Sequence, residues 1–282
     1  MGVTVKAYAK LNFTLDITGA SDGFHMLDSL VCTVDLYDTV KVKKRRDKLV
    51  NIVMHGCGTE TLPYEHNNAA KAAESFINAF GTCGADITIY KNIPVGGGLG
   101  GSSADVAGVL NAMSRLYGVG SERQIKELAD ELGSDTGYLL SGGWARLTGR
   151  GERVQSLDIK TKLYILLLLP QSGVSTAECY RVCDGLQGSL PRTADALSAL
   201  LKEDLTAFGG SLGNALYPAA TQLNPDVEKA FSELEDFAPL GVNMTGSGSG
   251  VFAIFPTREL RDWAKSRYGG KFRQIELKTQ IF

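Results

Sequence analysis

The sequence predicts an α+β protein of two domains, residues 1–155 and residues 156–282. Three observations lead to this prediction. The chain has 282 residues, which is enough for two modest domains. Strand-like runs dominate its first part and lead into a glycine-rich segment at residues 94–101. A second alternation of strand-like and helix-like runs begins after residue 155.

The expected elements follow from the spacing of apolar residues, which alternates in strands and recurs every third or fourth residue in helices. In the first part, β-branched runs predict mostly antiparallel strands at residues 3–9, 12–17, 26–34, 39–44, 49–54 and 85–93. Helical spacing predicts helices at residues 68–80, 104–116 and 121–132. In the second part, the same patterns predict strands at residues 162–169, 250–255 and 272–277, and helices at residues 175–184, 193–202 and 224–234.

Composition argues against several classes of partner. A net charge of −2 and a pI near 6.0 give no general attraction for nucleic acid or anionic membranes. The one basic cluster, residues 41–48, alternates lysine with valine as an exposed hairpin would, so we interpret it as a solvated strand end. The longest apolar run, residues 164–170, is too short to cross a bilayer, and the N-terminus has no signal-peptide pattern. We expect a cytoplasmic protein that binds neither nucleic acid nor membrane.

Cysteine and histidine spacing predicts no metal site. The five cysteines are odd in number and contain no CxxC pair. Cys179 and Cys183 could share one face of a helix, but no histidine or second pair completes a ligand set. We interpret the cysteines as reduced thiols that pack in the interior.

Residues 94–107, PVGGGLGGSSADVA, are the most informative segment of the chain. Glycines and two serines stand between a strand-like run and a helix-like run. Several backbone N–H groups can then converge on one anion, at a helix N-terminus that carries a partial positive charge. The segment therefore predicts a phosphate-binding loop.

Two better-known nucleotide loops do not fit this segment. A Walker loop needs Lys followed by Ser or Thr after its last glycine, and GK[ST] occurs nowhere in the chain. A dinucleotide fingerprint fits Gly96, Gly98 and Gly101 only as a degenerate match inside a glycine tract. The remaining alternative is a flexible surface connection, which does not need serines next to an apolar helix.

Three further motifs carry side chains suited to chemistry. Lys10 and Asn12 are two residues apart in a strand-like run, so both project from one face toward a common ligand; an exposed strand lysine is the alternative. Asp135 stands where a new helix begins, and its simpler role is an N-cap that accepts from the backbone two or three residues on. Residues 244–255, MTGSGSGVFAIF, form a second glycine-serine turn, a pattern that is also typical of a tight hairpin.

Together these motifs resemble the GHMP kinase superfamily. The resemblance covers nearly the whole chain and rests, in order and at family-like separations, on AKLNFTLDITG, DGFHMLDSL, IPVGGGLGGSSAD, LGSD, GVSTAECY and MTGSGSGVFAIF. Within the superfamily, DGFH, Lys91 and VSTAECY are similar to the cytidine-binding pattern of the branch that acts on 4-diphosphocytidyl-2-C-methyl-D-erythritol.

The resemblance implies a two-domain GHMP kinase fold, with a ribosomal-protein-S5-like N-terminal domain, a ferredoxin-like C-terminal domain and an active site in the cleft between them. It implies phosphorylation by ATP of the 2-hydroxyl of that cytidine diphosphate-linked methylerythritol, in the non-mevalonate isoprenoid precursor pathway. Mg²⁺ is expected on general grounds, because it neutralises phosphate oxygens, but the sequence names no carboxylate ligand. We expect a monomer or a weak homodimer. The alternatives are a GHMP kinase for homoserine, mevalonate or a sugar, and a non-catalytic nucleotide-binding homologue.

The resemblance also implies roles for individual residues. Asp135 would draw the proton from the substrate hydroxyl, and Lys10 would stabilise the alkoxide and the migrating phosphoryl group. His25 would read the cytosine edge, with Phe24 and Tyr180 enclosing the faces of the base. The implied ATP-binding residues are Pro94, Gly96, Gly97, Gly98, Leu99, Gly100, Gly101, Ser102, Ser103 and, near the adenine, Asn67. The implied substrate-binding residues are Asn12, Phe24, His25, Lys91, Thr176 and Tyr180.

Four positions depart from the family pattern. Ser102 stands for a glycine and Ala104 for the second serine of GLGGGSSDAA, so Ser103 is the serine expected to act at the phosphates. Phe24 replaces a tyrosine, which keeps a stacking face and removes a hydroxyl. Gly137 stands where proline is usual after the aspartate and is expected to loosen that turn.

Overall fold

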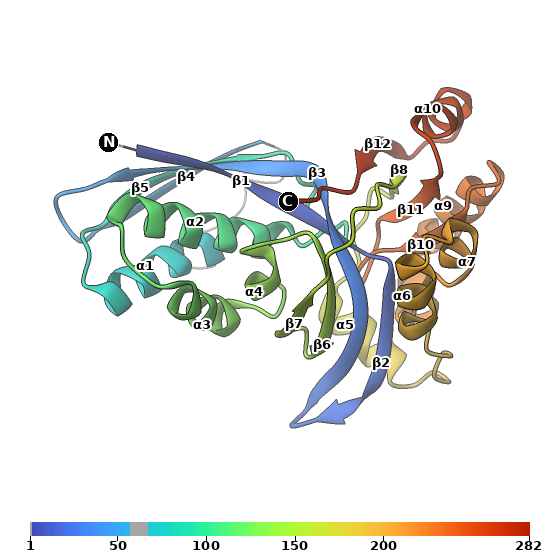
Figure 1. Ribbon diagram of the computed structural model, residues 1–282, viewed down its shortest axis with the longest axis horizontal. Helices are drawn as coiled ribbons and strands as arrows, with labels where there is room; N and C mark the ends of the chain where they lie inside the picture. The colour runs from blue at the N-terminus through green and yellow to red at the C-terminus, as the bar shows by residue number, and fades with distance from the viewer. Residues whose placement is uncertain (1, 57–66) are drawn as a thin grey trace. The chain divides into compact units, whose positions relative to one another are not determined.

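The computed structural model describes residues 2–56 and 67–282 (Figure 1). These residues form two compact units that interleave along the chain. The first unit contains residues 2–9, 36–95 and 100–142 within the described ranges, and the second contains residues 10–35, 96–99 and 143–282. The units describe packing, and the domain division near residue 155 stays a prediction.

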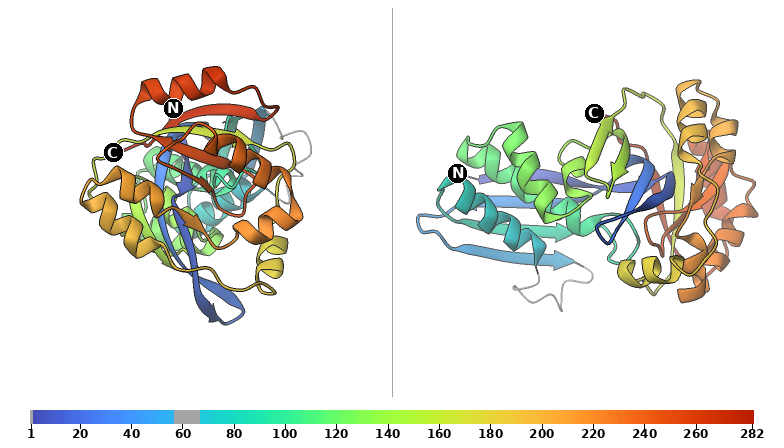
Figure 2. Two further views of the ribbon diagram at one scale, coloured as in Figure 1. Left: turned by 90° about the vertical axis from the view of Figure 1, so that its right-hand side faces the viewer. Right: turned by 90° about the horizontal axis from the view of Figure 1, so that it is seen from below.

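The first unit is a sheet with helices along one face (Figures 1 and 2). Its strands are the first part of β1 (Gly2–Asn12), the second part of β3 (Phe24–Lys44), β4 (Val50–Gly56) and β5 (Ala85–Lys91). β5 lies between β3, to which it is antiparallel, and β4, to which it is parallel. The helices are α1 (Asn68–Phe80), α2 (Gly101–Tyr117), α3 (Glu122–Leu132) and α4 (Thr136–Leu139).

Alternation along the strands explains how this sheet buries one face. Val40 and Val42 on β3 and Ile87 and Ile89 on β5 are buried, and β-branched residues of this kind suit a pleated surface. The helices α1 and α2 supply the other side of the core. The buried residues of α1 recur at helical spacing, whereas α2 is buried at every residue from Ala104 to Leu110. The sheet and its helices thereby hold both ends of the glycine-rich segment, since β5 precedes it and α2 follows it.

The second unit contains the first part of β3, the end of β1 and two further groups of strands. β2 (Thr14–Ser21) pairs with β3 and with β9 (Gly213–Asn214), and β6 (Trp144–Gly149) pairs with β3 and with β7 (Arg153–Ser156). A separate antiparallel sheet has the order β10 (Gly241–Met244), β11 (Val251–Phe255), β8 (Tyr164–Leu169) and β12 (Arg273–Lys278). The helices are α5 (Thr176–Cys183), α6 (Thr193–Leu201), α7 (Leu205–Gly210), α8 (Tyr217–Leu223), α9 (Asp226–Glu235) and α10 (Arg258–Arg267).

One core cluster of the second unit lies on one face of the four-stranded sheet. Leu166 and Leu168 of β8 and Val251 and Ala253 of β11 point into one cluster with buried residues of α8 and α9. β11 is buried along its whole length, as a continuous apolar run at the centre of a sheet should be. The cluster therefore gives rigid support to residues 245–250, which connect β10 to β11.

Each predicted helix and strand is present with shifts at its ends, and one expectation is wrong. The strands predicted at residues 26–34 and 39–44 are one strand, β3, in which Asp38 is buried and binds Lys91 and the N–H groups of Asn92 and Ile93. The solvated strand end expected at residues 41–48 is confirmed, because β3 ends at Lys44 and the lysines of this segment are exposed. The spacing of apolar residues did not predict seven elements, most of which are short: β6, β7, β9, β10, α7, α8 and α10.

Among the helices of residues 2–56 and 67–282, none is long and apolar enough to span a bilayer.

Candidate active site

The glycine-rich loop between β5 and α2 takes a shape that depends on glycine. Gly96, Gly98 and Gly100 have φ values of 75°, 71° and 71°, in the left-handed region that side chains disfavour. A Cβ on Gly98 would also lie 2.0 Å from the carbonyl oxygen of Thr245. Glycine is therefore required at this position for two separate reasons.

Hydrogen bonds within the second unit hold residues 96–99 in place. The Ser249 N–H donates to the Gly96 carbonyl at 3.1 Å, the Thr245 hydroxyl to the Gly98 carbonyl at 3.1 Å, and the Lys10 N–H to the Leu99 carbonyl at 3.0 Å. Leu99 is 1% exposed. The flexible surface connection that was the alternative is therefore wrong, and the tight hairpin at residues 245–250 also serves as a support for this loop.

The bonded carbonyls determine where the loop directs its N–H groups. The peptide bonds here are trans, and a trans peptide points its N–H away from its C=O. Because the carbonyls of Gly96, Gly98 and Leu99 face protein partners, the N–H groups of the next residues face the opposite way. These N–H groups precede the N-terminus of α2, and this is the arrangement that binds a phosphate.

Lys10 and Asn12 form a buried polar pair at the end of β1. Each is 4% exposed, and the Lys10 Nζ donates to the Asn12 Oδ1 at 2.5 Å. The Asn12 amide in turn donates to the Ser29 hydroxyl at 2.8 Å, which orients it. The exposed strand lysine that was the alternative is wrong, because an ammonium is buried only where polar partners receive it.

Asp135 belongs to the first unit and directly precedes α4. Its backbone is already helical, with φ −82° and ψ −12°, and its side chain makes no capping hydrogen bond. The N-cap role is therefore wrong, since an N-cap residue has an extended backbone from which its side chain reaches the next N–H groups. The carboxylate is not used to begin the helix.

Five aromatic and polar side chains of the second unit make three contacts. His25 stacks on Tyr180 with ring centroids 4.6 Å apart and an interplanar angle of 26°, and its Nε2 lies 2.6 Å from the Asp184 Oδ1. Phe24 lies beneath the Arg150 guanidinium, 4.8 Å from the ring centroid. The Asp184 contact restricts the imidazole ring, while the enclosure of a base by Phe24 and Tyr180 stays a prediction.

The N-terminus of α5 meets the connection between β10 and β11. The Thr176 and Ser247 hydroxyls are 2.9 Å apart and hydrogen-bonded. Tyr180 lies one turn further along α5, on the same face as Thr176. Two predicted substrate residues of this helix thus point along one side, and Thr176 is joined to the segment that supports the glycine loop.

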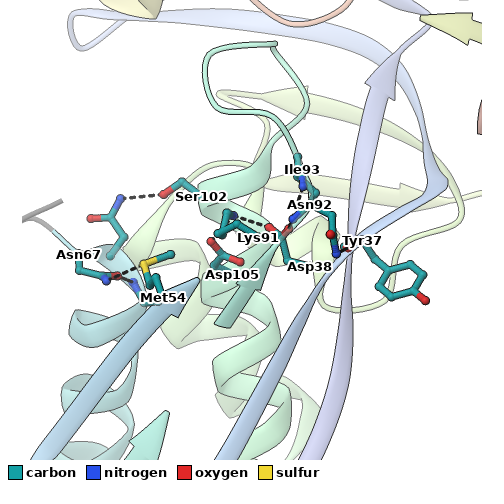
Figure 3. A network of polar contacts seen from close by, with 11 residues as sticks. Tyr37, Asp38, Met54, Asn67, Lys91, Asn92, Ile93, Ser102 and Asp105 are labelled. Carbon is teal, nitrogen blue, oxygen red and sulfur yellow. Dashed lines mark hydrogen bonds and ion pairs between the residues drawn. The ribbon is translucent and has the colours of Figure 1, made fainter. Parts of the chain in front are cut away.

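Three residues expected to bind ligands have partners in the first unit (Figure 3). Asn67 is the N-cap of α1, and its Oδ1 accepts from the Ala69 N–H at 3.0 Å. The Ser102 hydroxyl accepts from the Asn68 amide at 3.3 Å. Lys91 has a side chain only 5% exposed, and its ammonium contacts two carboxylates, Asp38 and Asp105. The interaction of Lys91 with substrate stays a prediction, and the geometry shown is a buried ion-pair network.

Burial and charge change the pKa values in this network. Desolvation raises the pKa of Asp105 to about 7 from an ordinary 3.8, with Lys91 opposing the rise and Asp38 adding to it. Burial lowers the pKa of Lys91, but the two carboxylates outweigh it and raise that pKa above 10.5. The lysine therefore stays charged at neutral pH, while Asp105 exchanges its proton near neutrality.

We expect this network to make stability fall as the pH rises from about 4 to about 7. A carboxyl whose pKa is higher in the folded state binds its proton more tightly there, so folding is favoured most at the lower pH. Asp105→Asn resembles the protonated side chain and should flatten the fall. Thermal melting of both proteins at pH 5 and pH 7.5 measures the difference, and parallel shifts in the two proteins would contradict the expectation.

No group of three or more metal-ligating side chains is found in the described parts of the chain. Cys57 and His66 lie outside the described residues. Burial raises the pKa of Cys32 and Cys179, and this favours the thiol form over the thiolate that binds metals.

Comparison with known proteins identifies the family. The GHMP kinases N terminal domain matches residues 67–145, and the GHMP kinases C terminal domain matches residues 196–273. The chain belongs to the GHMP kinases. It is accordingly an ATP-dependent phosphotransferase that acts on a small molecule, and the fold class expected from the sequence is confirmed.

Individual GHMP kinases resemble the chain over its whole length. A 4-diphosphocytidyl-2-C-methyl-D-erythritol kinase of Pelotomaculum thermopropionicum is 36% identical, over 100% of this chain and 99% of the relative. A crystal structure of 4-(cytidine 5'-diphospho)-2C-methyl-D-erythritol kinase has a TM-score of 0.81 and 27% identity, covering 99% of this chain and 100% of that one. A homoserine kinase from Cytophaga hutchinsonii has a TM-score of 0.76 at 20% identity, covering 99% of this chain and 95% of that one, and shares the fold alone.

The sequence motifs did not predict several polar residues that contact the site residues of this GHMP kinase. Asp38, Asp105 and Asp184 are partners of predicted site residues, but none belongs to a motif that names its partner. A buried partner for Asp38 could have been predicted, because this aspartate lies in a long run in which apolar residues alternate, and a buried carboxylate needs a partner. The identity of that partner depends on pairing across the sheet.

Proposed function

We propose that this GHMP kinase transfers the γ-phosphoryl group of ATP to the 2-hydroxyl of 4-diphosphocytidyl-2-C-methyl-D-erythritol, a step in non-mevalonate isoprenoid precursor synthesis. The observation that carries the proposal is the 36% identity to a kinase of that name over the full length of both chains. Fold alone does not choose the substrate, because a homoserine kinase shares the fold. A cytoplasmic location and a monomeric or weakly dimeric state are part of the proposal.

The second unit supports recognition of the cytidine end of this substrate. Tyr180 and His25 are aromatic side chains already stacked on each other, and aromatic rings bind nucleobases by stacking. His25 is held by Asp184, so its ring can present a defined nitrogen to the polar edge of the base. Phe24 is 53% exposed and offers a further stacking face. We assign the base to this region, with Thr176 nearby on α5.

For catalysis, we assign the proton acceptor to Asp135 and the charge-stabilising cation to Lys10. Asp135 does not cap α4, and its carboxylate is the kind of group that accepts a hydroxyl proton. Lys10 is oriented by Asn12, and a buried ammonium stabilises developing negative charge more strongly than a solvated one. Asn12 is assigned to the same substrate end because it holds this ammonium.

For ATP, we assign the phosphates to the N–H groups of residues 96–101 and the α2 N-terminus, with Ser102 and Ser103 following. Pro94 leads into this loop and Asn67 is assigned to the adenine side. Two hydroxyl oxygens approach Gly133: a Cβ on this residue would lie 3.0 Å from the Thr136 hydroxyl, which is buried without a hydrogen-bond partner among the described residues, and 3.7 Å from the Ser103 hydroxyl. Mg²⁺ takes oxygen ligands. We assign Ser103 as its protein ligand. The ion would neutralise phosphate charge during transfer.

The decisive test is ligand binding by Tyr180→Ala. Loss of one aromatic stacking partner removes roughly 1–3 kcal/mol, which corresponds to roughly 5- to 150-fold weaker binding. We expect this loss for 4-diphosphocytidyl-2-C-methyl-D-erythritol and for CDP, with the affinity for ATP nearly unchanged. Isothermal titration calorimetry with each ligand measures it, alongside turnover of the full substrate.

Tyr90→Ala is the matched control. Tyr90 also stacks on a histidine, His55, at 5.2 Å and 24°, but it belongs to β5 and to none of the motifs. It should leave CDP binding unchanged. Wild-type protein that binds no CDP and phosphorylates homoserine, mevalonate or a sugar would refute the proposed substrate, and absence of turnover on every alcohol would favour a non-catalytic homologue.

A further inference from the structure

Lys91 is the centre of a buried charge network below the glycine-rich loop (Figure 3). It is the last residue of β5, and its ammonium contacts Asp38 on β3 and, at 2.5 Å, the Asp105 Oδ2 on α2. Asp38 is completely buried and Asp105 is 4% exposed. One lysine therefore joins a strand, a neighbouring strand and a helix that all belong to the first unit.

The same network holds the chain where it enters the loop. The Asp38 Oδ1 accepts hydrogen bonds from the Asn92 N–H at 2.5 Å and the Ile93 N–H at 2.9 Å. The Asn92 side chain also donates to the Tyr37 carbonyl at 3.0 Å. Because one Asp38 oxygen accepts from two consecutive N–H groups, the backbone of residues 92–93 is held in one orientation against β3.

The network also holds the chain where it leaves the loop. A Cβ on Gly101, the first residue of α2, would lie 3.7 Å from the Lys91 Nζ and 3.1 Å from the Ile93 side chain. Asp105 lies one turn further along α2 and binds the same ammonium. The entry at Ile93 is thus joined to the cation through Asp38, and the helix that follows the exit is joined to it through Asp105, across a loop of only seven residues, 94–100.

Stability alone is a weak reason for such a network. Two buried carboxylates face one cation, and the Asp105 Oδ1 has no hydrogen-bond partner among the described residues. Buried ion pairs recover little more than their desolvation cost, so an apolar cluster of the same volume would stabilise the fold as well. What the charged groups add is a defined geometry between the strands and the helix.

We propose that Asp38, Lys91 and Asp105 are positioning residues that hold both ends of the glycine-rich loop in its phosphate-binding shape. In this role Lys91 acts through the loop, because its ammonium is held by two buried carboxylates. The inference rests on the proposed assignment of this loop to ATP.

Asp105→Leu is the principal test. Leucine has a similar size and lacks the oxygen that binds Lys91, while the Lys91 and Asp38 charges still balance each other. We expect ATP binding to weaken by about tenfold or more, because a small displacement of positioning groups has large effects. Affinity for CDP should not change. Hydrogen exchange should accelerate at residues 92–103 and stay unchanged in α5.

Asp105→Asn and Asp262→Leu are the matched controls. Asparagine keeps an acceptor for Lys91 and can donate to Asp38, so ATP affinity should stay within about twofold of the wild type. Asp262→Leu removes the carboxylate partner of a different buried cation, Arg261, which lies in no motif. It should lower the melting temperature without any change in ATP affinity.

Two results would overturn the inference. One is a folded Asp105→Leu protein that binds ATP as the wild type does, and the other is an equal loss of ATP and CDP affinity. If Asp105→Leu does not fold, Asn92→Ala replaces it, since that exposed side chain holds the loop entry to Tyr37. The affinity for ATP tests this inference, and the affinity for CDP tests the proposed substrate. If the wild-type protein does not bind CDP, the ATP measurements still test the role of the network.

Discussion

Asp135→Asn is expected to lower kcat by roughly two to four orders of magnitude, the usual contribution of a positioned general base. Asparagine has nearly the same shape but cannot accept the hydroxyl proton. Because the Asp135 side chain does not cap α4, the substitution should leave this helix in place, and thermal melting checks that the protein is folded. Single-turnover kinetics with saturating ATP measures the chemical step directly.

Lys10→Ala should lower kcat by a comparable factor for a different reason, since it removes a cation and not a base. Asp130→Asn is the control in the same segment: Asp130 pairs with Lys126 at 2.6 Å on α3 and has no assigned role in the reaction. Its turnover should stay close to that of the wild type. Substantial turnover by Asp135→Asn with unchanged melting would refute the assigned base.

Gly98→Ala is expected to have the second large effect, on both folding and ATP binding. Its Cβ would lie 2.0 Å from the Thr245 carbonyl oxygen, in a backbone with φ +71°. Overpacking against backbone and a left-handed conformation each cost about 1–3 kcal/mol, so the free energy of unfolding should fall by several kcal/mol. Denaturant unfolding and calorimetric titration with ATP measure the two losses.

Gly118→Ala separates the two causes. Gly118 has a similar φ of +68°, but a Cβ there has nothing within 4 Å. It should lose only the conformational part, about 1 kcal/mol, and bind ATP normally. Equal destabilisation by the two substitutions would mean that the contact with Thr245 does not hold the loop.

Local patterns were enough to place the chemistry-bearing segments along the chain. The helix at residues 68–80 begins after Asn67 and ends before Gly81 with φ 63°, and both signals are readable in the sequence. The strand, glycine loop and helix around residues 85–117 follow from periodicity and from the conformations that only glycine adopts readily. The pairing of Lys10 with Asn12 follows from strand alternation.

The hydrogen-bond and ion-pair partners of individual polar side chains could not be predicted from local patterns. The sequence predicted two strands where β3 is one, and it left a capping role for Asp135 open. In the structure Asp38 lies inside β3 and binds Lys91, and the Asp135 side chain does not cap α4. Each outcome depends on which residues lie opposite in space, and a single side chain is compatible with several partners.

The family, the α+β architecture and the positions of the loop, the lysine and the aspartate are all readable from the chain, because spacing and backbone preference act over a few residues. The folded protein was needed to show that residues 96–99 bind residues 245–249, that His25 binds Asp184, and that Lys91 joins β3 to α2. A buried charge or carbonyl must find a partner, and sheet pairing and helix packing bring that partner from a distant part of the chain.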